Sequence, residues 1–168
     1  EHRATEAMLK ASGLPHVVLR NGWYTENHTA SLPAALAHGV VLGCAGDGRF
    51  STAARADYAA AAAAAMTLPD QAGRIYELAG DSAYDLGGFA AEIARQTGKP
   101  VAYNNMTESD YKNALTGFGL PEALAAMLAD SDAGASKGGL FDESRQLSAL
   151  IGRPTTPLSE TVAAALKA

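Results

Sequence analysis

Apolar positions along the chain fall either into short continuous runs or into helical spacing, and this combination predicts an α/β fold. The runs are bounded by glycine or proline and predict four short strands, at 16–20, 40–44, 74–79 and 101–103. The spaced segments predict helices at 4–11, 27–37, 57–68, 86–97, 107–116, 122–128, 142–151 and 160–166. The first run lacks polar alternation, so we expect a parallel strand that is covered on both faces.

Glycine and proline add expectations about the connections. Pro33 lies inside a helical pattern and predicts a kink or a restart of that helix. The turn residues 46–48 separate the strand at 40–44 from a fifth short strand at 49–52, which together predict a β-hairpin. The segment 130–140 is rich in glycine, serine and aspartate, so we expect a mobile loop, and such loops often act as lids.

Charged residues near two helix starts have structural interpretations. Asp57 precedes the longest alanine run and Asp85 precedes the helix at 86–97, so both are expected to cap a helix. Arg55 is expected to pair with a carboxylate or a carbonyl. These expectations favour structural roles over ligand binding for all three residues.

A polar and aromatic cluster follows the first predicted strand and is the candidate site. Asn21, Trp23, Tyr24 and Asn27 lie just past its carboxyl end, where open α/β sheets bind their ligands. Asn21 and the adjacent Gly22 have few structural reasons to stand there, which favours a ligand role. Trp23 and Tyr24 also fit simple packing at the sheet edge, because both are large and amphipathic.

Composition and charge exclude several classes of protein. The 168 residues suffice for one domain with a core, and a net charge of -5 with pI near 5.3 argues against nucleic acid or an anionic membrane surface as the main partner. The single cysteine, Cys44, excludes an intrachain disulfide and fits the cytoplasm, a reducing compartment. The sequence lacks an initiator methionine and enters helical periodicity at once, so we expect the C-terminal portion of a longer protein.

Common catalytic patterns are missing from the sequence. No glycine-rich fingerprint follows a strand, since the glycines at 46–48 precede one and those at 138–139 have none before them. Cys44 has no obvious base, and no serine sits in a strand-turn-helix elbow. The four histidines share no spacing typical of metal ligands, so we expect no metal site.

Five motifs in order along the chain resemble the bacterial NAD(P)H:quinone oxidoreductases of the NmrA-like, atypical short-chain dehydrogenase group and, more distantly, the triphenylmethane dye reductases. The motifs are LRNGWY with Asn27, AGDG at 45–48, RADYA at 55–59, YELAG at 76–80 and KGGLF at 137–141. The resemblance implies an α/β fold, the C-terminal portion of an NAD(P)-binding Rossmann-type doubly wound fold, with a small, mostly helical substrate-binding region. The resemblance places the Rossmann-type portion at 1–80, with the hairpin inserted in it. The helical substrate-binding region follows at 81–168 and is not an independent domain.

The resemblance also implies roles for individual residues. Asn21, Gly22, Trp23 and Tyr24 would close the nicotinamide end of the cofactor. His2 stands where related reductases carry a lysine near the nicotinamide ribose and is the candidate catalytic residue; a plain position on a helix surface is the alternative. The residues implied to bind the acceptor are Trp23, Tyr24, Asn27, Phe50 and Lys137.

The function implied by the resemblance is hydride transfer from NADPH to a quinone or a similar electron-poor small molecule, without flavin or metal. NADH stays open as the donor, and the choice of NADPH rests on the family alone. The oligomeric state stays open between a monomer and a homodimer. The alternative function is a non-catalytic redox sensor that binds a dinucleotide and a protein partner. The aromatic acceptor residues favour the enzyme, since a regulator has no need for them.

Overall fold

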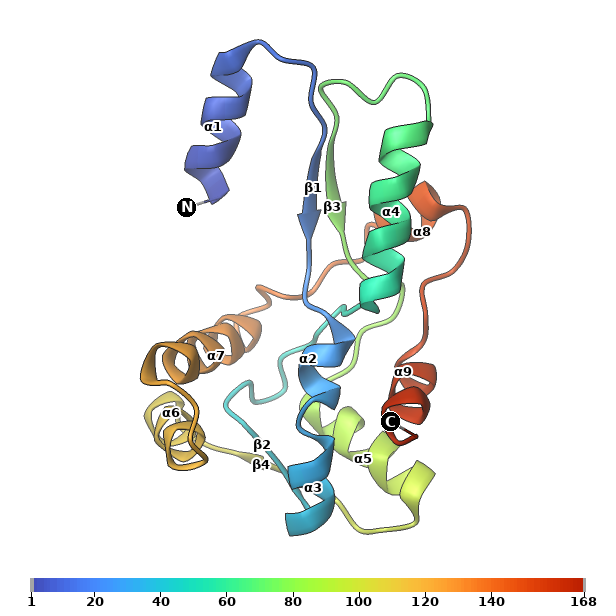
Figure 1. Cartoon of the computed structure of the whole chain (residues 1–168). Helices are drawn as coiled ribbons and strands as arrows, with labels where there is room; N and C mark the ends of the chain where they lie inside the picture. The colour runs from blue at the N-terminus through green and yellow to red at the C-terminus, as the bar shows by residue number, and fades with distance from the viewer. Residues whose placement is uncertain (1, 168) are drawn as a thin grey trace.

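The computed structural model describes residues 2–167, in which helices and short strands alternate as the sequence predicts (Figure 1). The strands are β1 (Val18–Asn21), β2 (Val40–Gly43), β3 (Ile75–Leu78) and β4 (Ala102–Asn105). The helices are α1 (His2–Ser12), α2 (Thr25–Thr29), α3 (Leu32–His38), α4 (Arg55–Thr67), α5 (Leu86–Thr97), α6 (Glu108–Gly117), α7 (Glu122–Ala135), α8 (Gln146–Ile151) and α9 (Leu158–Ala165).

The strands form two separate parallel pairs. β1 runs beside β3 with Val18 opposite Ile75 and Asn21 opposite Leu78. β2 runs beside β4 with Val40 opposite Ala102. Helical connections between paired strands make the parallel arrangement possible. In Figure 1 the β1–β3 pair stands beside α4 and α8, and the β2–β4 pair lies lower, near α3 and α5.

Buried side chains form a core that joins distant parts of the chain. One cluster contains Leu32, Val41, Phe89, Ile93 and Val162, and so ties α3 and β2 to α5 and α9. The residues 1–80 and 81–168 therefore share this core. A second cluster packs α4 and α8 against the β1–β3 pair: Ala53, Tyr58, Ala61, Leu78 and Leu147. The alanine side chains of α4 permit this close approach.

The helix predicted at 27–37 restarts, as Pro33 indicates. α2 ends at Thr29, and α3 begins with the proline in its first turn, where a missing N–H costs nothing. Gly39 ends α3 in the left-handed conformation, with φ of 67°. Asp85 caps α5 as predicted, because its carboxylate accepts a hydrogen bond of 2.6 Å from the Gly88 N–H.

The predicted hairpin is wrong. The chain does turn after β2, with the Gly48 N–H bound to the Ala45 carbonyl at 2.8 Å, but residues 49–52 do not return along β2. β4 pairs with β2 instead, and Phe50 forms an antiparallel bridge with Tyr84. A strand that lies far downstream in the sequence thus satisfies the hydrogen-bonding groups that a hairpin would have used.

The predicted mobile loop at 130–140 is wrong over its first half. α7 continues to Ala135, and Ala129, Asp132 and Ala135 are buried at helical spacing. Burial of this face outweighs the low helix propensity of the glycine, serine and aspartate residues between them. The remaining residues, 136–140, form a turn that leads to the candidate site.

Candidate functional site

A cleft opens at the carboxyl ends of β1 and β3. It has a volume of about 360 Å³, and Asn21, Gly22 and Trp23 line one side of it. The opposite side contains the end of β3 and the loop residues Leu140 and Phe141. The structure thus brings three of the four predicted cofactor residues together at one strand end.

Gly22 allows the chain to pass close to β3 at this point. Its N–H donates to the Leu78 carbonyl at 2.8 Å, and a Cβ placed on Gly22 would lie 2.9 Å from that same oxygen and 3.2 Å from the Tyr58 hydroxyl. A larger residue would push the strand ends apart. The glycine therefore keeps the cleft floor in place.

Trp23 separates this cleft from a second, apolar cavity. The second cavity has a volume of about 390 Å³ and is lined mainly by aliphatic and aromatic side chains of α3, α6 and α7, such as Leu115, Phe118 and Leu128. Asn27 also lines it. The buried indole N–H of Trp23 has no hydrogen-bond partner among the described residues. Trp23 is thus the wall that both spaces share.

The other predicted site residues lie outside both spaces. The Tyr24 ring packs against Tyr58 at 5.1 Å between centroids, and the Arg55 guanidinium lies 5.5 Å from its centre. This is the packing role that sequence left open for Tyr24. Phe50 is fully buried in the core beneath Trp23, and Lys137 is exposed on the surface.

Arg20 connects the cleft to α1. Its guanidinium donates hydrogen bonds to both carboxylate oxygens of Glu6, at 2.9 and 2.6 Å. It also donates to one carboxylate oxygen of Glu77, at 2.5 Å. These two carboxylates raise the pKa of Arg20 well above its usual range, so it stays charged. The hydrogen bonds from Arg20 lower the pKa of the Glu6 carboxyl, and His2, which is exposed and lies one turn earlier on α1, adds a smaller effect in the same direction.

Two residues of the apolar cavity, His28 and Asp132, escaped the sequence interpretation. Asp132 is 8% exposed, and its carboxylate accepts a hydrogen bond of 2.9 Å from the Cys44 N–H. Burial raises the pKa of Asp132 to about 6. Burial lowers the pKa of His28 to about 4, so its imidazole is neutral at physiological pH. Local spacing gave no signal for either residue, because the partners of both come from other segments.

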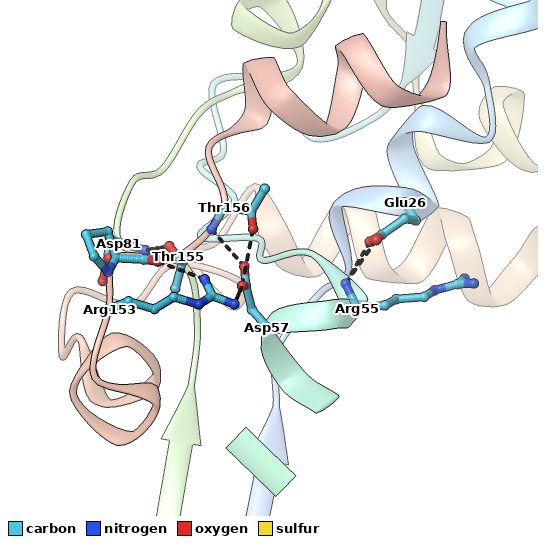
Figure 2. A network of polar contacts seen from close by, with 8 residues as sticks. Glu26, Arg55, Asp57, Asp81, Arg153, Thr155 and Thr156 are labelled. Carbon is cyan, nitrogen blue, oxygen red and sulfur yellow. Dashed lines mark hydrogen bonds and ion pairs between the residues drawn. The ribbon is translucent and has the colours of Figure 1, made fainter. Parts of the chain in front are cut away.

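The prediction that Asp57 caps α4 is wrong. The cap is Ala54, and Asp57 lies fully buried in the first turn (Figure 2). Its carboxylate accepts hydrogen bonds from the Thr156 N–H at 2.8 Å and hydroxyl at 3.2 Å, and it pairs with Arg153 at 2.7 Å. Asp57 therefore fastens the segment before α9 to α4.

Arg55 finds its partners on α2. Its backbone N–H is bound by both oxygens of the Glu26 carboxylate, at 3.0 and 3.1 Å. Its guanidinium reaches the Asn27 side-chain oxygen at 3.5 Å. The sequence predicts that Arg55 pairs with a carboxylate or a carbonyl. Its backbone N–H contacts the Glu26 carboxylate, and its guanidinium contacts the Asn27 amide oxygen. These contacts fix α2, and with it the cavity wall.

Within residues 2–167 no group of three or more histidine, cysteine, aspartate or glutamate side chains is arranged to hold a metal ion. The described helices are also too short or too polar to cross a bilayer.

Comparison with known proteins identifies the relatives of this chain. It is 59% identical to quinone oxidoreductase 2 of Escherichia coli (strain K12) over 162 residues, which cover 96% of this chain and 57% of that protein. The crystal structure of the same Escherichia coli enzyme in complex with NADPH superimposes with a TM-score of 0.96, over 98% of this chain and 58% of that one. The chain is a relative of quinone oxidoreductase 2. No family model matches it.

A second relationship extends the comparison. The triphenylmethane reductase of Citrobacter sp. is 31% identical and superimposes with a TM-score of 0.92, over 99% of this chain and 58% of that one. The resemblance seen in the five motifs is confirmed, and so is the α/β fold, which matches the C-terminal portion of the Rossmann-type fold of quinone oxidoreductase 2. The chain spans about 57% of the length of that enzyme.

Proposed function

We propose that the protein containing this chain is an NADPH-dependent quinone reductase, with NADH as the alternative donor. One observation carries the proposal: a cleft at the strand ends and an apolar cavity share a single aromatic wall, Trp23. A hydride donor and an apolar acceptor need such adjoining spaces, because hydride transfer requires the two reacting atoms to lie in contact. The relationship to quinone oxidoreductase 2, solved with NADPH, supports the identity of the donor.

The cleft suits the nicotinamide end of the cofactor. Gly22 holds the ends of β1 and β3 close together at the cleft floor, and Asn21 offers a side-chain amide at the rim. Arg20 lines the same cleft and, through its ion pair with Glu6, fixes α1 to the cleft rim. The hydride itself is supplied by the nicotinamide. The described residues contribute position and shape, and His2 would assist near the ribose through the helix that Arg20 anchors.

The apolar cavity suits a flat, electron-poor acceptor. Its volume of about 390 Å³ falls in the range of small-molecule sites, and Trp23 and Asn27 are the predicted acceptor residues that line it. Tyr24, Phe50 and Lys137 would shape the site indirectly. We place the reaction in the cytoplasm, with a quinone-like small molecule as the partner and a homodimer as the candidate assembly.

The test is turnover by the natural full-length protein. NADPH oxidation is followed by absorbance with 2-methyl-1,4-naphthoquinone as the acceptor. We expect quinone-dependent oxidation that falls at least tenfold in Trp23→Ala and severalfold in Asn21→Ala. Asn113→Ala, an exposed asparagine on α6, is the matched control and should keep the full rate. A wild-type rate no higher than that of Trp23→Ala would contradict the proposal.

A further inference from the structure

His28 joins the apolar cavity to a chain of hydroxyl groups in the core. Its ring lies edge-on to Phe50 at 4.8 Å between centroids and 5.6 Å from Phe89, and it lines the cavity together with Trp23. Its Nδ1 lies 2.8 Å from the Tyr84 hydroxyl. The imidazole is therefore fixed on one edge by the core and borders the cavity elsewhere.

The hydroxyl chain has one direction. The Thr52 hydroxyl donates to the Tyr84 oxygen at 3.0 Å, so the single proton of that oxygen is free to go to His28. The Thr25 hydroxyl lies 2.8 Å from that of Thr52 and is left as the donor of that pair. Burial raises the pKa of the Tyr84 phenol well above its usual range, so the phenol keeps its proton.

This direction favours one histidine tautomer. When Nδ1 accepts the Tyr84 proton, a neutral imidazole carries its own proton on Nε2. Burial keeps the side chain neutral by lowering its pKa to about 4. The other titratable groups that line the cavity are His38, Tyr111 and Asp132. Among the described residues the His28 ring makes a hydrogen bond only at Nδ1. Nε2 lies on the other side of the ring, away from the Tyr84 hydroxyl.

We propose that His28, held as the Nε2–H tautomer by Tyr84, donates a hydrogen bond to a carbonyl oxygen of the acceptor in the apolar cavity. This rests on the proposed function, which assigns the cavity to the acceptor. A donor in an apolar site favours a ligand that can accept a hydrogen bond, because the donor otherwise stays unpaired. A neutral donor also favours a carbonyl compound over a cationic dye.

The first experiment measures binding by calorimetry with the full-length protein. The probes are 2-methyl-1,4-naphthoquinone and 2-methylnaphthalene, which differ in the two carbonyl groups. His28→Phe keeps the aromatic packing and removes the donor, so we expect about tenfold weaker binding of the quinone and less than a twofold change for the hydrocarbon. His28→Gln, which places an N–H near the position of Nε2, should recover most of the quinone affinity.

The second experiment reads the tautomer directly by nitrogen NMR at neutral pH. We expect a protonated Nε2 and an unprotonated Nδ1 in the wild type, a change in the Nε2 signal when the quinone is added, and a mixture of tautomers in Tyr84→Phe. A proton on Nδ1 in the wild type, or equal losses of quinone and hydrocarbon binding in His28→Phe, would overturn this inference alone. If the wild-type protein bound no quinone, the proposed function would be contradicted as well.

Discussion

The Asp57 carboxylate lies 2.7 Å from the Arg153 guanidinium, and the two ends of this ion pair have very different surroundings. The Asp57 side chain is fully buried, whereas that of Arg153 is 48% exposed. Removing the cation leaves a buried charge without a counter-ion, but removing the anion leaves a charge that water can solvate. The pair is therefore asymmetric in its effect on stability.

Arg153→Met should lower the free energy of unfolding by about 3 kcal/mol, because the buried Asp57 then has only the hydrogen bonds of Thr156. Urea denaturation measures the change. The double variant with Asp57→Asn should recover at least half of the loss, since no buried charge remains. Arg3→Met, on the exposed face of α1, is the control and should be neutral; equal losses in both single arginine variants would contradict the stabilising role of this ion pair.

Gly80→Ala should destabilise the protein strongly. A Cβ at this position would collide with the Thr52 carbonyl carbon and oxygen, which are backbone atoms and cannot rotate away. The Gly80 N–H is also bound to the Ser51 carbonyl at 2.9 Å, so the two segments cannot separate without losing that bond. We expect a loss of at least about 2 kcal/mol, as for overpacking in a core.

Gly117→Ala provides the matched control for Gly80. Gly117 is the last residue of α6, and a Cβ there would meet nothing within 4 Å. Alanine favours the helix by up to about 1 kcal/mol. Thermal unfolding should therefore give a lower melting temperature for Gly80→Ala and an unchanged or higher one for Gly117→Ala. Similar melting temperatures for the two variants would show that the Thr52 backbone can give way.

Asp132 and His28 should affect stability in opposite directions over the same pH range. The pKa of Asp132 is raised from 3.8 to about 6, so the folded state binds the proton more tightly and the free energy of unfolding falls as pH rises through that window. The pKa of His28 is lowered from 6.5 to about 4, so there the unfolded state binds the proton more tightly and the free energy rises with pH. The two contributions largely cancel in the wild type.

Single substitutions should reveal each slope. In Asp132→Asn, stability should rise by up to about 3 kcal/mol at neutral pH and should increase with pH between about 4 and 6.5. In His28→Gln it should decrease with pH across the same range. Urea denaturation at several pH values and constant ionic strength measures both, with His2→Gln as an exposed histidine control. If the free energy of unfolding changed with pH in the same direction in both variants, the opposite effects predicted for Asp132 and His28 would be excluded.

Cys44 should react slowly as a nucleophile although its side chain is partly exposed. Burial, with the Asp132 carboxylate as the second cause, raises the pKa of its thiol from 9.0 to about 11. The thiolate fraction at pH 8 is then about a hundredfold smaller than for an ordinary cysteine. Modification by a disulfide reagent should be slower by at least that factor in the native protein than in urea. Equal rates would show that the thiol is exposed and ionised.

Local sequence determined most elements of this protein and pointed to one strand end as the candidate site. Apolar spacing, Pro33, Gly39 and Asp85 placed helix and strand boundaries well, because each acts through neighbours within a few residues. The position of Asn21, Gly22 and Trp23 at the end of a strand was enough to predict the cleft, because parallel strands bring their carboxyl ends to one edge. The prediction that this strand is covered on both faces is wrong, since Val18 and Leu19 of β1 are half-buried and Arg20 and Asn21 are exposed.

Tertiary structure alone decided what depends on contacts between distant segments. β2 could have paired with residues 49–52, but it pairs with β4, because pairing is chosen by global packing. Asp57 has the sequence context of a cap, yet its partners come from about a hundred residues away, and the same is true of Asp132 and Cys44. The tautomer of His28 depends on Thr25, Thr52 and Tyr84, whose distances in sequence carry no signal. Local preferences show where a helix or a strand can form, but the free energy of burying a charge or a hydroxyl depends on which other segments surround it.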